Sequence, residues 1–171
     1  MLYCIIGPSG SGKSSVVNKL IEMGYKAPDS YTTRPKRNPN ETGHTFITDE
    51  EYDMLDDVVA NTVFNGYKYC VTREMLEGCN LYVVDPEGVR TLEKHGYFDF
   101  KVIGLELDAS SCAVRMLSRG DKVEDILGRL DNDWYIFKDF DTICDYKINA
   151  SNDISVIVDD IIKIMKDVEG N

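Results

Sequence analysis

The segment that most constrains this chain is GPSGSGKSS, which runs from Gly7 to Ser15 and follows the apolar run LYCII. It matches the pattern G-x-x-x-x-G-K-[ST] without exception. Glycines at these positions let backbone N–H groups turn inward around a phosphate, and a helix that begins directly after the loop points its positive end at the same place. A short apolar run before the loop is typical of a buried parallel strand. The pattern therefore predicts a strand, a loop and a helix that together bind a nucleoside triphosphate.

In this interpretation Lys13 bridges the β- and γ-phosphates, and the hydroxyl of Ser14 ligates Mg²⁺. Mg²⁺ is thus the predicted cofactor, bound together with the triphosphate. The residues predicted to surround the phosphates are Gly7, Pro8, Ser9, Gly10, Ser11, Gly12, Lys13, Ser14 and Ser15.

Length and composition indicate a single globular domain. The chain has 171 residues, of which 43% are hydrophobic, and its longest apolar runs are too short to span a bilayer. The N-terminus has no basic region before its apolar run, so we expect no signal peptide. Five scattered cysteines, an odd number without a C-x-x-C pair, are typical of reduced thiols in a cytoplasmic protein. His44 and His95 are assigned no role, and we expect them at surface or turn positions.

The charge distribution favours a small anionic ligand over nucleic acid or a membrane surface, because the net charge is −11. Five of the seven arginines nevertheless fall into two groups. Arginine presents a planar fork of donors that fits phosphate oxygens. Such groups can also be solvated helix faces paired with acids. The groups are Arg34 with Arg37, and Arg115 with Arg119 and Arg129.

Strand and helix patterns alternate along most of the chain, which predicts an α/β fold with a parallel sheet between helical layers. Apolar strands are expected in NLYVVD, FKVIGLELD and DYKINA. Four helices are expected: one from the end of the phosphate loop to Gly24, one that starts at Pro86, one that starts at about Ser110, and one over SNDISVIVDDIIKIMKDV. The pattern changes between residues 30 and 71. Thr48 and Glu51 form a possible capping box for a helix through Val59, with short strands expected near residues 44–47 and 67–71. We expect this segment to be a small lobe inserted into the core.

The chain resembles the guanylate kinase family. The segments GPSGSGKSS, TTRPKR, FNGYKYCVT, VVDPEGV, RGDKVEDILGRL and DYKIN occur in the family's order and at nearly its spacing, so the resemblance covers almost the whole chain. It implies a three-layer P-loop core over residues 1–29 and 80–171, a nucleoside-monophosphate-binding lobe over about 30–79, and an arginine-bearing lid over about 115–130. It also implies transfer of the γ-phosphate of ATP to GMP or dGMP.

The resemblance assigns roles to individual residues around the acceptor. Ser30 matches a serine that hydrogen-bonds the guanine edge, and Arg34 and Arg37 match the pair that grips the acceptor phosphate. Tyr69 matches a further donor to that phosphate. Asp85 matches an aspartate that faces the acceptor base and the water shell of the metal, although the same carboxylate could simply cap the helix that starts at Pro86.

The lid arginines and one asparagine complete the implied set. Arg115, Arg119 and Arg129 match arginines that close over the two phosphate chains, exclude water and place positive charge on the transferring group. With Lys13 and Arg34 they form the predicted catalytic set. Asn149 matches an asparagine near the adenine of ATP.

The chain departs from the family pattern on the acceptor side. Phe46 stands in place of a phosphate-binding tyrosine, and Ala60 in place of a glutamate that accepts hydrogen bonds from guanine. Asn61 lies beside Ala60, and Thr72 lies next to the position of a family hydroxyl residue; both are included in the predicted acceptor site. A site that reads a base by hydrogen bonds loses selectivity when a polar partner is removed.

The expected function is therefore an Mg²⁺·ATP-dependent kinase of guanylate kinase type, a cytoplasmic monomer or homodimer that binds ATP and GMP or dGMP. Two different functions stay open. One is a kinase of the same fold with another acceptor, either a different nucleoside monophosphate or a ribose bisphosphate. The other is a non-catalytic guanylate-kinase-like module that binds phosphorylated peptides; the intact phosphate loop and the lid arginines speak against it.

Overall fold

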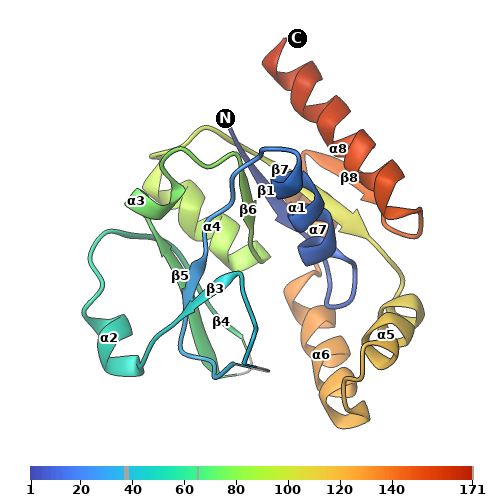
Figure 1. Ribbon diagram of the computed structural model, residues 1–171, viewed down its shortest axis with the longest axis horizontal. Coiled ribbons are helices and arrows are strands. Elements are labelled where there is room, and N and C mark those ends of the chain that lie inside the picture. Colours follow the sequence, from blue (N-terminus) through green and yellow to red (C-terminus); the bar gives the residue numbers. More distant parts are fainter. Residues whose placement is uncertain (37–38, 65, 171) are drawn as a thin grey trace.

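The computed structural model describes residues 1–36, 39–64 and 66–170, and its central element is a parallel sheet. The strands of this sheet lie in the order β6-β1-β7-β8, so the strand before the phosphate loop is in its interior (Figure 1). They are β1 (Leu2–Ile6), β6 (Leu81–Val83), β7 (Phe100–Glu106) and β8 (Tyr146–Asn149). The predicted α/β fold with a parallel sheet is confirmed.

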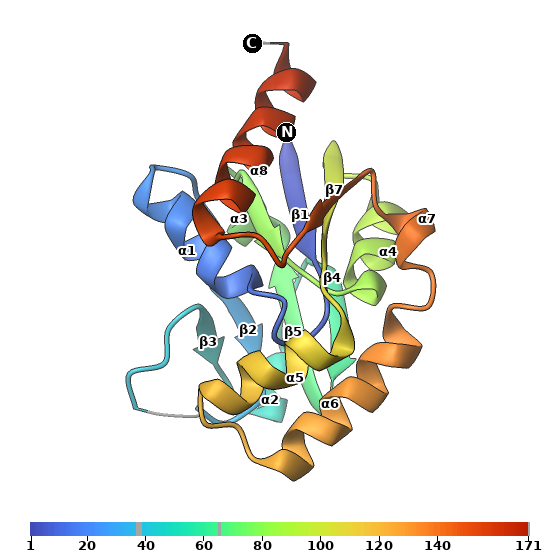
Figure 2. The same ribbon diagram turned by 90° about the vertical axis from the view of Figure 1, so that its right-hand side faces the viewer.

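Alternate residues of β1 enter two different hydrophobic cores, because successive side chains of a strand point to opposite faces. Tyr3 and Ile5 pack toward α1 (Lys13–Glu22) and α8 (Ile154–Glu169). Leu2, Cys4 and Ile6 pack in the other cluster, with residues of α4 (Pro86–His95). Figure 2 shows the sheet between α1 and α8 on one side and α4 on the other. Burial on both faces explains why the strand is apolar throughout.

A second sheet comes entirely from the segment between residues 30 and 72. Its order is β3-β2-β5-β4, with β4 and β5 paired as an antiparallel hairpin. The short helix α2 follows β3, and α3 follows β5. The bounds are β2 Ser30–Thr32, β3 His44–Phe46, α2 Asp49–Asp53, β4 Val58–Phe64, β5 Tyr67–Thr72 and α3 Arg73–Leu76.

The predicted helix from Thr48 through Val59 is wrong in its length. The capping box of Thr48 and Glu51 is present, but the helix that it starts ends at Asp53. The chain then turns through Asp57, whose φ is 54°, and enters β4. Val58 and Val59 are β-branched and pack better on a sheet than in a helix. A capping box marks where a helix starts and carries no information about where it ends.

Two further helices, α5 (Ala109–Ser118) and α6 (Val123–Ile136), project from the core beside the second sheet (Figure 1). Cys112 and Met116 of α5 pack against Ile126 of α6 in a small core of their own. The short helix α7 (Phe140–Ile143) leads back to β8. Among the described residues, no helix has the length and apolar character needed to cross a membrane.

Two glycines provide a test of the packing. Gly104 lies on β7, where an added Cβ would come within 2.4 Å of the Cys144 sulfur and 2.5 Å of a Phe140 ring carbon, whereas Gly128 on α6 has nothing within 4 Å. Gly104→Ala is expected to lower the free energy of unfolding by about 1–3 kcal/mol through overpacking. Gly128→Ala is expected to raise it by about 0.5–1 kcal/mol through helix propensity. Urea denaturation measures both, and equal effects of the two substitutions would contradict this account.

Candidate active site

The loop between β1 and α1 is shaped by glycines and by one lysine. Gly10 has a φ of 82°, and a Cβ at this position would lie 2.7 Å from the carbonyl oxygen of Cys112. Only glycine meets both conditions without strain. Lys13 folds back over the loop, and its Nζ donates to the carbonyl oxygens of Gly7 at 2.5 Å and Pro8 at 3.0 Å. These two hydrogen bonds tie the beginning of the loop to the first residue of α1.

The loop forms one wall of a cleft of about 560 Å³. The structure brings all three predicted lid arginines into the lining of this cleft. Its described lining comprises residues 9–16, His44, Phe64, Arg115, Arg119, Arg129, Asn152, Ile154 and Ile157. Four cationic side chains therefore face one cavity, as binding of a triphosphate requires.

Internal partners hold the arginines in place. Arg115 donates to the carbonyl oxygens of Ser11 at 3.1 Å and Ala150 at 2.7 Å, so it joins the phosphate loop to the end of β8. Arg119 donates from Nε at 2.9 Å and from Nη2 at 2.6 Å to the two carboxylate oxygens of Asp121. Arg129 lies 3.8 Å from the same carboxylate. The arginines are thus fixed in direction before any ligand is bound.

Burial changes the titration of the loop lysine. Removal of the ammonium group from water lowers the pKa of Lys13 to about 8, and the nearby carboxylate of Asp133 opposes this shift. The lysine therefore has its charge at neutral pH and loses it under moderately alkaline conditions.

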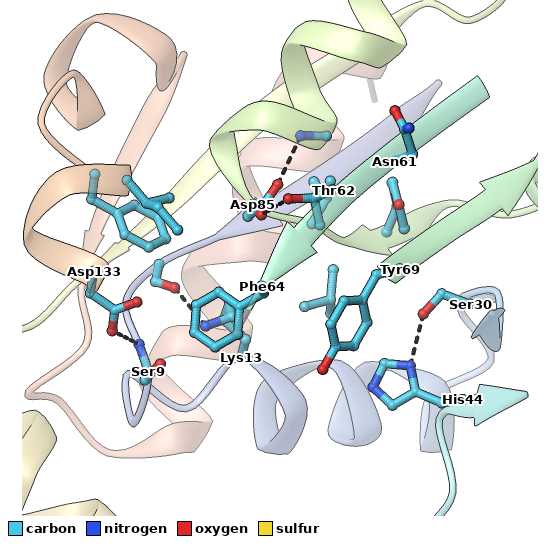
Figure 3. Close-up of a pocket in the computed structure, with 17 residues that line it drawn as sticks. Ser9, Lys13, Ser30, His44, Asn61, Thr62, Phe64, Tyr69, Asp85 and Asp133 are labelled. Carbon is cyan, nitrogen blue, oxygen red and sulfur yellow. Dashed lines mark hydrogen bonds between the residues drawn. The ribbon is translucent and has the colours of Figure 1, made fainter. Parts of the chain in front are cut away.

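A second cavity, of about 200 Å³, adjoins the first (Figure 3). The two cavities share Ser9, Lys13, His44 and Phe64 as lining residues. The predicted acceptor residues that line the second cavity are Ser30, Asn61, Tyr69 and Asp85. Its other lining residues are Gly7, Thr62, Tyr82, Val83, Val84, Gly88, Asp133, Ile136 and Phe137.

Asp85 both caps a helix and faces this cavity. Its Oδ1 accepts from the backbone N–H of Gly88 at 2.8 Å, which caps α4, and its Oδ2 accepts from the hydroxyl of Thr62 at 2.6 Å (Figure 3). The two roles that the sequence left open are thus compatible. Asp85 follows β6 at the carboxyl edge of the parallel sheet, where α/β folds bind ligands.

Arg34 follows β2 and holds parts of the second sheet together, although it lines neither cavity. It is 8% exposed, and its guanidinium contacts both carboxylate oxygens of Glu41, at 2.7 and 3.2 Å. Its Nε donates to the hydroxyl of Tyr69 at 3.2 Å, and its Cζ lies 5.5 Å from the ring centre of Phe46. Phe46 therefore supplies a ring surface for the guanidinium. Arg37 lies outside the described residues.

Ala60 does not face the cavity. It is fully buried in the core beside Val59 and Val71, next to an irregularity in the pairing of β4 with β5. The side chains of β4 that do line the cavity are Asn61, Thr62 and Phe64. A polar group at this wall is therefore supplied by Thr62, two residues beyond the position to which the family glutamate was matched.

Thr72 and Asn149, like Arg34, lie outside both cavities. Thr72 is the last residue of β5 and pairs with Val58. Asn149 lines a separate cavity behind the phosphate loop, with Pro8 and Leu107, and its Oδ1 accepts from the backbone of Ser151 at 2.9 Å. Their roles in binding stay predictions.

The cavities also contain residues to which the sequence gave no role, among them His44, Thr62, Phe64 and Asp133. His44 lies on β3, not in a turn, and its Nδ1 is 2.8 Å from the hydroxyl oxygen of Ser30. Its ring contacts that of Tyr69 edge-on, with 5.8 Å between the ring centres. One signal could have indicated Asp133, because it is an acidic residue four positions after Arg129 on the same helix face. Phe64 and His44 had no such signal.

The residues present fit a magnesium ion that arrives with a nucleotide. Ser14, in the first turn of α1, is exposed and lines the phosphate cleft. Mg²⁺ keeps several waters and binds through one or two protein oxygens together with phosphate oxygens. Within the described ranges, no cluster of three histidine, cysteine or acidic side chains could hold a metal by itself.

No protein-family model matches this chain. Individual relatives and solved structures do resemble it. A guanylate kinase from Polaromonas sp. is 32% identical over 83 residues, 44% of this chain and 40% of the relative. The first relatives, at 32% identity, are thus matched over less than half of their own length. A guanylate kinase from Pseudoalteromonas translucida is 28% identical over 176 residues, 92% of this chain and 85% of the relative. A ribose 1,5-bisphosphate phosphokinase from Thiobacillus denitrificans is 27% identical over 143 residues, 75% of this chain and 73% of the relative.

Solved structures share the fold. The crystal structure of guanylate kinase from Anaplasma phagocytophilum has a TM-score of 0.70 at 21% identity and covers 97% of this chain and 84% of its own. The YorR protein from Bacillus subtilis, solved in complex with phosphorylated GDP, has a TM-score of 0.57 at 15% identity and covers 100% of this chain and 99% of its own. Together with the guanylate kinase relatives that align along most of the sequence, they show that this chain is similar to guanylate kinases in sequence and shares their fold.

Proposed function

We propose that this chain transfers the γ-phosphate of ATP to GMP or dGMP. The observation that carries the proposal is that two cavities meet at Lys13, one lined by the phosphate loop and three arginines and the other by residues of both sheets. A donor phosphate chain in the first and an acceptor in the second would meet beside the lysine ammonium. The guanylate kinases among the relatives support the acceptor.

The reaction in this arrangement depends on positioning and charge. Lys13 and the lid arginines would stabilise the negative charge that spreads over the transferring phosphoryl group. The acceptor phosphate is already anionic, so no general base is needed. Magnesium, held by Ser14 and the phosphates, would neutralise further charge. Coverage of the cleft by α5 and α6 would exclude water and limit hydrolysis of ATP.

Base selection would use groups other than the family glutamate. A guanine edge offers N–H donors, and the carboxylate of Asp85, held by Thr62, is an acidic acceptor in the lining of the second cavity. Asn61, which precedes Thr62 on β4, and Ser30, hydrogen-bonded to His44, provide further polar contacts (Figure 3).

A second candidate is a kinase with a ribose bisphosphate acceptor. Two observations favour it: the ribose 1,5-bisphosphate phosphokinase among the relatives, and the burial of Ala60 away from the cavity. Without a glutamate at this position, less of the cavity is committed to reading a base.

The proposal is tested by ADP production from Mg²⁺·ATP with single acceptors. GMP, dGMP, AMP, UMP, CMP, dTMP and ribose 1,5-bisphosphate are offered separately, with an acceptor-free control for hydrolysis. Turnover with GMP or dGMP at least tenfold above every other acceptor is the expected result. Preferential turnover of the bisphosphate would establish the second candidate, and no turnover with any of the compounds would refute both.

The hydroxyl of Thr62 is expected to matter for the acceptor alone. Thr62→Val keeps the volume but removes the donor to Asp85, so KM for GMP should rise by about tenfold, the usual scale for a hydrogen bond to a charged group, with KM for ATP unchanged. Val63→Thr is the matched control, because Val63 is the next residue of β4 and is 66% exposed. An equal change in both KM values would contradict a role confined to the acceptor cavity.

The lowered pKa of Lys13 predicts how ATP binding depends on pH. Below pH 8 the ammonium is charged and binding is at full strength; above about pH 8 the free protein loses this charge, so Kd for Mg²⁺·ATP should rise by up to about tenfold per pH unit. Calorimetric titrations between pH 7 and 9.5 measure this. Lys13→Arg stays charged throughout, so its Kd should be flat over the same range. A constant Kd for the unaltered chain would show that the lysine does not titrate there.

A further inference from the structure

The lid helix α6 buries a carboxylate for which the proposed chemistry has no use. Asp133 is 6% exposed and, with Ile126, forms the buried side of this helix. A buried carboxylate is costly unless hydrogen bonds and opposite charges compensate the loss of water. Its partners therefore indicate why the structure accommodates it.

Its partner is the phosphate loop. Oδ2 of Asp133 accepts a hydrogen bond from the backbone N–H of Ser9 at 2.7 Å (Figure 3). The preceding residue, Pro8, has no N–H, so Ser9 provides the first amide donor after Gly7. Lys13 donates to the carbonyls of Gly7 and Pro8. The first part of the loop is thus held by α1 through the lysine and by the lid helix through Asp133.

The charged surroundings fit a carboxylate at this position. Lys13 faces it from α1, Arg129 from one turn earlier on α6, and the thiol of Cys112 from α5. Burial raises the pKa of Asp133, while the hydrogen bonds from Ser9 and the charges of Lys13 and Arg129 oppose that shift. The carboxylate therefore lies between the loop lysine and a lid arginine.

We propose that Asp133 is a positioning residue that fastens the phosphate loop to the lid helix and so preorganises the loop for the triphosphate. A glycine-rich loop has many accessible conformations, and fixing one of its peptides from a helix reduces the entropy lost when the ligand binds. The same helix carries Arg129, so the position of this arginine relative to the loop is fixed as well. The identity of the ligand rests on the proposed function.

Three variants test the proposal. Asp133→Ala removes the acceptor, Asp133→Asn keeps one oxygen that can accept from Ser9, and Asp131→Asn removes a charge from an exposed position of the same helix. Binding of a non-hydrolysable ATP analogue with Mg²⁺ is measured by calorimetry, and kcat and KM for both substrates are measured alongside. Thermal unfolding shows whether each variant is folded at the temperature used.

The expected result is a Kd about tenfold higher for Asp133→Ala, on the scale of a lost hydrogen bond to a charged group, with KM for the acceptor unchanged. Asp133→Asn should lie within about twofold of the unaltered chain, as should Asp131→Asn. An unchanged Kd for Asp133→Ala would overturn the proposal. So would an Asn variant as weak as the Ala variant, or an equal loss of affinity for both substrates.

Failure of this proposal can be told apart from failure of the proposed kinase function. If the analogue binds but no acceptor is phosphorylated, the function is refuted while the comparison of the three variants stands. If the unaltered chain does not bind the analogue, both proposals are overturned.

Discussion

The site depends on the enclosure of the Lys13 ammonium by the carbonyls of Gly7 and Pro8. This contact closes the loop at the beginning of α1 and puts a cation where the two cavities meet. It requires a backbone that turns back on itself, which explains the glycines, and a rigid strand behind it, which explains the apolar run of β1. Burial also makes the lysine easier to deprotonate, so the geometry that positions the charge also limits the pH range in which it is present.

A second feature is that acidic side chains hold much of the positive charge in place. Asp121 holds Arg119 and lies near Arg129, and Glu41 holds Arg34. In the proposed function, an incoming phosphate would replace one anionic partner with another, and the arginines would already be ordered when it binds. The chain's strong net negative charge is compatible with phosphate ligands because Lys13 and three arginines line one cleft.

Sequence reasoning succeeded where a local structure follows from neighbouring residues. The phosphate loop, the cap at Asp85 and the capping box at Thr48 all involve groups within a few positions of each other, so spacing alone identifies them. It failed where strand pairing decides the outcome. β2 was not predicted, and β4 was in part taken for helix, because the pairing of each strand with β5 involves residues distant in sequence. His44 illustrates the consequence, since it reaches the second cavity only because β3 pairs with β2 and brings it beside Ser30.

The amino-acid sequence by itself determined the kind of fold, the phosphate loop and the groups of arginines, because these are written in local periodicity, in glycine spacing and in residue types suited to phosphate. Only the tertiary structure decided which side chains line the second cavity. Ala60 and Thr62 share one face of β4, and their position along the strand decides which of them reaches the cavity: Ala60 is buried in the core, and Thr62 lies where the core ends and the cavity begins. The contact of Asp133 with Ser9 joins residues 124 positions apart, and no local pattern contains it.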